Sequence, residues 1–460
     1  MMTRGKAQSY HSAMRGSLPD LIGLDLDLRR LLDGLWRRPP IGEREVEQRA
    51  RELLLDTIGC AIGGCGLPEV AALIVSISKG DLGSHFFPGM GNRLSRTGFV
   101  LAFSAASCAL EACEGLPLAH GRPGLHAIPP ALAAALAEGR TLGEVLDAVT
   151  IGYEVGARLG NVCRIRPGMH VDGTWGSYGA AATESRLRGL SPAETLAALS
   201  HAACHLPYSL YRPITYGSDA RNLYVGHGAL LGMASATASA AGFGGPPGSV
   251  AEHAKLALGL ELSGLDPEIA PGERLILRGY LKKYPAVKHV HYGIEAGARW
   301  HKDHFSDGMR PERVTLEVYR EAMTYCGNRA PSTPIQAQFS LSYAVAWSLL
   351  HGPLGARAYL RESLEDPLVR RLESLVEIVE AEDMTRSGAR GCRLTVEAGD
   401  FSWTCEIDGV SGDASQPMTR SEIIDKFHPL TDPVIGPEAA ERIVQKILEA
   451  PLADPLRFYP

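Results

Sequence analysis

The stretch RELLLDTIGCAIGGC at residues 51–65 places its apolar residues at helical spacing and so predicts a buried amphipathic helix. From about residue 44 to residue 265 the chain continues as one helix-forming segment after another, rich in alanine and glycine. Small residues let helix axes approach closely. We therefore expect the first and larger part of the protein to be a compact, mostly buried helical bundle.

Capping boxes indicate where three of the helices begin. In this motif a serine or threonine and a glutamate three positions later each bond the backbone N–H of the other, which satisfies the first donors of the helix. The three pairs are Thr141 with Glu144, Ser191 with Glu194, and Thr419 with Glu422.

The hydrophobic period changes after about residue 275. Residues 313–319 alternate apolar and polar side chains, which predicts a half-buried strand. A second strand is expected near 375–380, and residues 392–407 read as a hairpin around an Ala-Gly-Asp turn. Between them, Thr333 is expected to cap a helix that runs through SLSYAVAWSLL. This part of the chain thus predicts a smaller α+β unit.

The tail of the chain returns to a helical pattern. The sequence therefore predicts a mainly α protein with a smaller α+β domain. We expect the helical domain to be discontinuous, formed by residues 1–273 and 412–460, with residues 274–411 as the α+β unit. A cleft between two such units is a common place for a ligand site.

Composition excludes several classes of partner. The 460 residues carry a net charge of −6 without a long basic block, so neither nucleic acid nor an acidic membrane surface is expected to bind. No run of residues is apolar for long enough to span a membrane, and the first 20 residues lack the apolar stretch of a signal peptide. Nine isolated cysteines without a CxxC pair favour reduced thiols and a cytoplasmic location.

A polar interruption of the apolar pattern lies at residues 111–129, EACEGLPLAHGRPGLHAIP. Glu111, Glu114, Arg122 and His126 fall within this one loop or turn. An acid and a histidine near an arginine suit proton transfer beside a bound carboxylate. The alternative is a solvated surface loop.

Two further polar groups precede helices made of small residues. His170 lies before the glycine-rich start of a helix, where backbone N–H groups could face an anion. Arg221 and Asn222 stand just before another such helix, and an arginine there could grip a carboxylate through two hydrogen bonds. A structural histidine and a surface ion pair are the corresponding alternatives.

The segment RGYLKKYPAVKHVH at residues 278–291 contains Lys282, which could bind a carboxylate or act in proton transfer. His289 and His291 resemble a metal-binding pair only weakly, because no further ligands follow at suitable spacing. Tyr325 lies in another polar cluster before a capped helix. No metal site is therefore expected, and no nucleophile elbow or phosphate loop is present in the sequence.

Taken in order, these clusters resemble the MmgE/PrpD family, which includes 2-methylcitrate dehydratase, cis-aconitate decarboxylase and iminodisuccinate epimerase. The resemblance covers nearly the whole chain. Its segments are LLDTIGCAIGG, IGYEVGARLG, the H-x-x-G-T motif at His170, LKKYP followed by H-x-H, and QAQFSLSY. It implies a helical domain from both chain ends with an α/β lid, and a cytoplasmic homodimer. It also implies proton chemistry beside a carboxylate of a small di- or tricarboxylate, without a metal or organic cofactor.

Carried over by position, the resemblance assigns proton transfer to His170 and places Lys282 and Tyr325 in the site. Arg221 falls where many relatives have a lysine. The loop at 111–129 departs from the family pattern: it reads LEACEG and GRPG, so that Cys113 replaces an aspartate and Arg122 a histidine. These changes remove a carboxylate acceptor and a group that exchanges protons near neutral pH.

The leading hypothesis is a cofactor-independent lyase or isomerase. The expected groups are Arg122, Arg221, Asn222 and Lys282 for the anion, His170 or His126 for the proton, Glu111 or Glu114 to orient a histidine, and Tyr325 to assist. Two alternatives remain open. One is a specialised biosynthetic isomerase or dehydratase with a substrate larger than citrate-like acids, and the other is a binding relative without catalysis.

Overall fold

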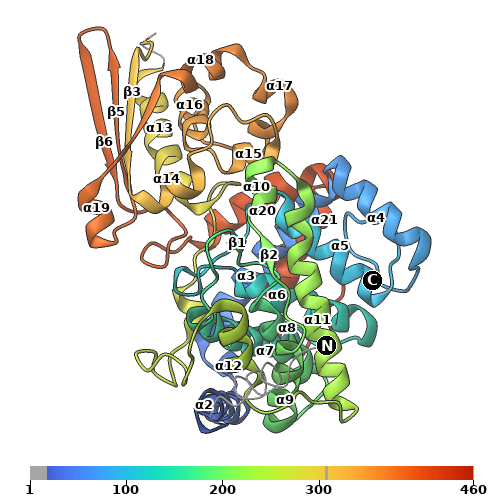
Figure 1. Cartoon of the computed structure of the whole chain (residues 1–460). Helices are drawn as coiled ribbons and strands as arrows, with labels where there is room; N and C mark the ends of the chain where they lie inside the picture. Colours follow the sequence, from blue (N-terminus) through green and yellow to red (C-terminus); the bar gives the residue numbers. More distant parts are fainter. Residues whose placement is uncertain (1–17, 306–308, 459–460) are drawn as a thin grey trace, which may run out of the picture.

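The computed structural model describes residues 18–305 and 309–458. They form two units, a larger helical one and a smaller one built on a sheet (Figure 1). The fold is mainly α with a smaller α/β part, as the sequence predicts.

The helical unit takes its helices from both ends of the chain. They are α2 (Leu18–Arg37), α3 (Arg44–Cys65), α4 (Pro68–Gly80), α5 (Arg96–Ala109), α6 (Pro123–Glu138), α7 (Leu142–Val162), α8 (Gly176–Leu187), α9 (Pro192–Ala203), α10 (Arg212–Tyr216), α11 (Tyr224–Ala240), α12 (Ser249–His253), α20 (Arg420–Ile435) and α21 (Pro437–Leu448). Two short antiparallel strands, β1 (Met169–His170) and β2 (Ser209–Leu210), join them. Short helical turns lie at Pro40–Gly42, Pro117–Ala119, Asp219–Leu223, Ala254–Leu258 and Leu275–Arg278.

Local signals account for how these helices begin and pack. All three predicted capping boxes are formed, at Thr141, Ser191 and Thr419. Close helix packing depends on glycine where α7 crosses α8. A Cβ atom on Gly152 would lie 2.7 Å from the carbonyl oxygen of Gly179, so a larger residue there would force the two helices apart.

The smaller unit contains a four-stranded sheet in the order β4-β3-β5-β6. Its strands are β3 (Arg313–Val318), β4 (Val376–Glu380), β5 (Cys392–Ala398) and β6 (Phe401–Ile407). Its helices are α13 (His291–His304), α14 (Arg320–Cys326), α15 (Pro334–Gln338), α16 (Leu341–His351), α17 (Arg361–Leu364), α18 (Pro367–Leu375) and α19 (Glu382–Ser387), with short turns at Lys288–Val290 and Ala356–Tyr359. β3 and β4 are parallel, and the other neighbours are antiparallel.

The predicted strands and the hairpin are confirmed. Val314, Leu316 and Val318 of β3 are fully buried, in line with the alternating pattern, and α13 and α16 pack against the sheet (Figure 1). The helix expected to continue from Thr333 is instead broken at Phe339. The Ser340 hydroxyl accepts the N–H of Tyr343 (3.2 Å) and donates to the carbonyl of Asn328 (2.7 Å), which starts α16 anew. The break places Phe339 in the wall of the cavity described below.

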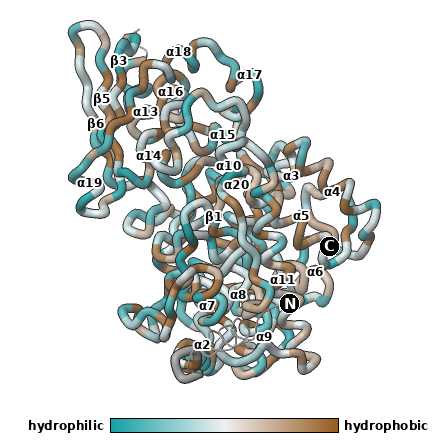
Figure 2. Tube along the Cα trace, in the orientation of Figure 1, coloured by the Kyte–Doolittle hydropathy of each residue, from teal (hydrophilic) through white to brown (hydrophobic). Residues whose placement is uncertain are grey.

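Each unit has its own apolar core. In Figure 2 apolar colours run through helices such as α5, and polar colours mark peripheral segments such as α19. The larger core includes Ile423 and Ile443 of the C-terminal helices, which pack on α3, so the helical unit is discontinuous. It also includes Leu275 and Leu281, whereas Tyr284 and Ala286 belong to the core of the smaller unit.

No single helix within residues 18–305 and 309–458 has both the length and the apolar composition to cross a membrane. Helices α3 and α4 meet those criteria only as a pair, bent by 89° at the break between them.

Candidate active site

A cavity of about 330 Å³ lies between the two units. The helical unit supplies one wall, largely from residues 111–175, and the chain from residue 280 onward supplies the other. Five of the predicted site residues line it: Glu111, Arg122, His170, Lys282 and Tyr325. Four others, Glu114, His126, Arg221 and Asn222, are buried around it without contributing to its lining.

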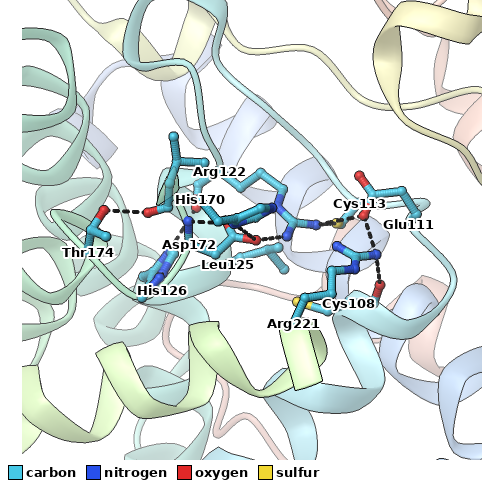
Figure 3. Close-up of polar contacts among 12 residues, drawn as sticks. Cys108, Glu111, Cys113, Arg122, Leu125, His126, His170, Asp172, Thr174 and Arg221 are labelled. Carbon is cyan, nitrogen blue, oxygen red and sulfur yellow. Dashed lines mark hydrogen bonds and ion pairs between the residues drawn. The ribbon is translucent and has the colours of Figure 1, made fainter. Parts of the chain in front are cut away.

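Glu111 is the centre of the buried end of this cavity. Its carboxylate pairs with Lys282 through Oε1. Through Oε2 it pairs with Arg221 at 2.6 Å and with Arg122 at 3.4 Å, and these three residues are labelled in Figure 3. Its backbone is in the left-handed region, with φ at 51°, which is uncommon for a residue with a side chain. Such strain persists only where surrounding contacts impose it, as at many functional sites.

The charge state of Glu111 follows from these contacts. Burial alone would raise the pKa of its carboxyl, but the positive charges of Arg221, Lys282 and Arg122 together hold it well below the usual value. Glu111 is therefore an anion that holds cations in place, and it does not itself exchange protons near neutral pH.

Arg122 lies at the start of α6, with Asp172 on one side and Cys113 and Glu111 on the other (Figure 3). On one side its guanidinium pairs with both carboxylate oxygens of Asp172, and on the other its Nη1 donates to Cys113 Sγ at 2.9 Å. The two residues that depart from the family pattern, Cys113 and Arg122, are thus in direct contact. Asp172 was not predicted as a site residue. The carboxylate only two positions after His170 is the feature of the sequence that could have indicated it.

His170 is the histidine of the predicted set whose ring lines the cavity. Its Nδ1 accepts the backbone N–H of Asp172 at 3.1 Å, so the proton of the neutral ring resides on Nε2. Nε2 forms no hydrogen bond with any residue in the described part of the chain, which leaves it available to a ligand. Burial, and then the charges of Arg122 and Arg221, lower the pKa of His170 to about 3.

His126 has a different role from the predicted one. Its Nδ1 bonds the carbonyl of Arg122 (3.1 Å), and its Nε2 accepts the N–H of Gly173 (3.0 Å). Burial lowers its pKa to about 4. Since both ring nitrogens are used by backbone groups, the geometry favours a neutral residue that ties α6 to the His170 segment, rather than one that transfers protons.

Glu114 also differs from its predicted role of orienting a histidine. Its Oε1 accepts the N–H groups of Gly124 (2.8 Å) and Leu125 (3.4 Å), two donors left free at the start of α6. Its Oε2 has no hydrogen-bond partner in residues 18–305 and 309–458. Burial raises its pKa to about 8 in spite of the two bonds. Glu114 therefore caps α6 and carries a proton at neutral pH.

The pKa of Glu114 has a measurable effect on stability. Between its usual value of 4.5 and about 8, the folded protein keeps a proton that the unfolded chain loses. In that range this group lowers the free energy of unfolding by up to about 1.4 kcal/mol per pH unit as the pH rises. Urea unfolding at several pH values should show a weaker decline for Glu114→Gln than for the wild type. Equal pH dependence in the two proteins would contradict the assignment.

Arg221 is fully buried behind Glu111 rather than exposed to the cavity. Its Nη2 also donates to the carbonyl of Cys108 at 3.2 Å, and its guanidinium lies 5.5 Å from the ring centre of Phe339. Its Nε and Nη1, like Oδ1 of Asn222, lack hydrogen-bond partners among the described residues. In this arrangement Arg221 contacts Glu111 and does not reach a ligand directly, and Asn222 is not placed to bind one.

Tyr325 stands at the other side of the cavity, on α14, and is 41% exposed. Its ring stacks on His289, with ring centres 6.0 Å apart, and its carbonyl accepts the hydroxyl of Tyr211 at 3.1 Å. His289 and Tyr211 line the cavity as well. Tyr325 is therefore placed to contact a ligand from the smaller unit.

His289 and His291, which resemble a metal-binding pair only weakly in the sequence, do not form one site. His289 bonds the hydroxyl of Tyr319 (2.6 Å), whereas His291 donates to the carbonyl of Ala286 (3.1 Å). Over residues 18–305 and 309–458, no group of three or more His, Cys, Asp or Glu side chains is arranged to hold a metal ion.

Fold and site together define a two-unit, mainly helical protein with a cation-rich cavity between the units. Two family models match it, the MmgE/PrpD N-terminal domain over residues 40–265 and the MmgE/PrpD C-terminal domain over residues 284–450. The chain belongs to the MmgE/PrpD family, which confirms the resemblance seen in the sequence. The second model includes α20 and α21, which in the structure pack on the helical unit.

Curated relatives match over most of the chain. It is 25% identical over 442 residues to a cis-aconitate decarboxylase-like protein of Aspergillus oryzae, covering 88% of this chain and 90% of the relative. It is 25% identical over 450 residues to a cis-aconitate decarboxylase of Aspergillus terreus, covering 88% and 89%. The human cis-aconitate decarboxylase is 22% identical over 426 residues, covering 87% and 86%.

Proposed function

We propose that this protein is a lyase or isomerase that removes or delivers a proton beside a carboxylate of its substrate. The observation that carries the proposal is the buried end of the cavity. There the ammonium of Lys282, the guanidinium of Arg122 and the neutral ring of His170 line the same cavity around the Glu111 carboxylate. The similarity to cis-aconitate decarboxylases supports a carboxylate substrate and lyase-type chemistry.

Lys282 is the principal group for the substrate carboxylate. Its ammonium donates one hydrogen to the Glu111 carbonyl (3.0 Å) and a second to the Glu111 carboxylate. An ammonium has three hydrogens, so the third is left for a ligand. Such a donor stabilises the negative charge that develops on the carboxylate when the neighbouring carbon loses a proton or carbon dioxide.

His170 is the proposed proton donor, acting through Nε2. The negative charge of a bound carboxylate opposes the charges of Arg122 and Arg221, which lower the pKa of this histidine. Substrate binding should therefore raise the pKa of His170 and let it carry the proton that is delivered to the substrate. Protonation places a hydrogen on Nδ1, which then donates to Asp172 Oδ2, 3.6 Å away, instead of accepting the Asp172 N–H, and the proton on Nε2 is the one delivered to the substrate.

The contact between Cys113 and Arg122 limits which groups can do proton chemistry. Arginine keeps its proton at any physiological pH, so Arg122 cannot exchange one as a histidine in its place could. Arg122 instead adds a fixed positive charge beside His170. The proton step then falls to His170, with Lys282 and Tyr325 as the other predicted site residues on the cavity wall that can titrate. We propose that these residues suffice without a metal or organic cofactor, in a cytoplasmic homodimer.

Solvent exchange tests this proposal directly. The protein is incubated in heavy water with a panel of di- and tricarboxylates, and NMR follows deuterium that enters beside a carboxylate. We expect incorporation with the wild type and its loss in Lys282→Ala. The matched control is Lys283→Ala, because Lys283 pairs with Glu295 (2.9 Å) outside the cavity and should not affect exchange. Thermal stabilisation by a panel compound without exchange would instead identify a binding protein.

A further inference from the structure

The cavity has a second polar group, distinct from the cluster around Glu111. It consists of Arg164 and His120 from the helical unit and Arg390 and Glu321 from the smaller one. No hydrogen bond or ion pair among the described residues joins it to the Glu111 cluster. Arg164 and His120 are exposed, whereas Glu111, Arg122, His170 and Lys282 are each at most 8% exposed. The cavity therefore has a buried polar end and a polar mouth that opens to solvent.

The two arginines of the mouth lie on opposite sides of the domain boundary. Arg164 follows α7, and Arg390 lies between α19 and β5. Both act on the same histidine: partial desolvation against the cavity wall lowers the pKa of His120, the charges of Arg164 and Arg390 lower it further, and that of Glu321 raises it. His120, Arg164 and Arg390 all line the same cavity, so both guanidinium groups are within reach of one ligand there.

The two arginines of the mouth have N–H donors that remain free to bind an anion. Arg164 donates to the side-chain oxygen of Asn161 at 2.9 Å and forms no ion pair within the described ranges. Arg390 pairs with Glu321 at 3.0 Å through one nitrogen. A guanidinium carries five N–H donors, so most donors of both arginines remain available for a carboxylate.

The lining of the cavity also contains many apolar side chains. Its apolar side chains include Leu116, Ile165, Val171, Trp175, Val287 and Phe339. His289 is part of the same lining, where its ring stacks on Tyr325 with ring centres 6.0 Å apart. The volume of about 330 Å³ falls in the range of roughly 300 to 1,000 Å³ that holds drug-sized molecules.

We propose that the substrate is an elongated dianion. One carboxylate binds at Lys282 and His170, an apolar segment crosses the middle of the cavity, and a second anionic group binds between Arg164 and Arg390. This inference rests on the proposed function for the chemistry of the buried end and adds the class of substrate. It makes Arg164 and Arg390 residues that determine specificity for length.

Binding of simple acids tests the inference. Calorimetry compares succinate, adipate and suberate, a series of dicarboxylates of increasing length, with octanoate as the monocarboxylate matched to suberate. We expect suberate to bind at least about tenfold more tightly than succinate or octanoate, as a hydrogen bond to a charged group would give. Arg164→Gln and Arg390→Gln should remove this preference and leave octanoate binding unchanged.

Arg166→Gln and Arg386→Gln are the matched controls, since both arginines are exposed and outside the cavity lining. Thermal melting confirms that each variant is folded. Equal or tighter binding of succinate by the wild type would overturn the inference, as would an equal loss of suberate and octanoate binding in the mouth variants. Deuterium exchange distinguishes this outcome from failure of the proposed function. Exchange with short acids that is unchanged when either arginine is replaced would refute only the elongated substrate.

Discussion

Turnover is expected to fall by at least about a hundredfold when His170 is replaced by alanine, the lower range for loss of a general acid or base. The ring lines the cavity, and its Nδ1 is held by the backbone N–H of Asp172 at 3.1 Å, so Nε2 is the atom that can meet a substrate. Alanine removes that proton donor while the fixed charges of Arg122 and Lys282 remain. Substrate binding should therefore weaken far less than the catalytic step slows.

Steady-state kinetics with a substrate from the deuterium-exchange panel would measure kcat and KM separately. His205→Ala is a suitable control, because His205 is an exposed histidine outside the cavity lining. His126→Ala is informative in another way: loss of its two backbone bonds should lower stability and activity together. Near-normal kcat in a correctly folded His170→Ala protein would reject the assigned role.

The largest expected effect on stability comes from Glu111→Leu. The carboxylate pairs with Arg221, which is fully buried, and with Lys282, which is 2% exposed. Removal of one partner leaves buried cations without a counter-charge, a change that typically costs about 3 to 5 kcal/mol. Urea denaturation of the wild type and the variant should show this loss.

A second variant separates lost charge pairing from simple loss of packing. In Glu111→Leu combined with Arg221→Leu, one unpaired buried cation is removed together with its partner. The double variant should therefore recover part of the stability that Glu111→Leu loses. A double variant whose loss equals or exceeds the sum of the two single losses would show that the ion pair is not the source of the effect.

Local structure was predictable where neighbours in the sequence create it. The capping boxes at Thr141, Ser191 and Thr419 depend on residues three positions apart, and the alternation in 313–319 follows from the pleat of a single strand. The helix expected to run on from Thr333 was wrong at Phe339, because the break depends on a bond from Ser340 to the distant carbonyl of Asn328. Helix propensity is a property of the local sequence, so it does not predict the hydrogen bond from Ser340 to that carbonyl.

The sequence predicted which residues belong to the candidate site better than it predicted what each of them does. The polar residues of 111–129 were identified, but Glu114 faces the start of α6 and His126 bonds only backbone groups, so neither reaches the cavity. Arg221 lies behind Glu111 and holds it instead of a ligand. Asp172 was not predicted, although it binds the arginine that departs from the family pattern.

By itself the sequence determined the fold class and the family, and it identified five residues that line the cavity. These follow from hydrophobic period, capping chemistry and motif order, all of which are carried by short segments. Only the tertiary structure decided which side chains reach the cavity and which hold others in place. Glu111 and Lys282, for example, are 171 residues apart in the chain and form one ion pair. Where a buried charged side chain points depends on the partner that neutralises its charge. That partner comes close only when distant segments of the chain fold together.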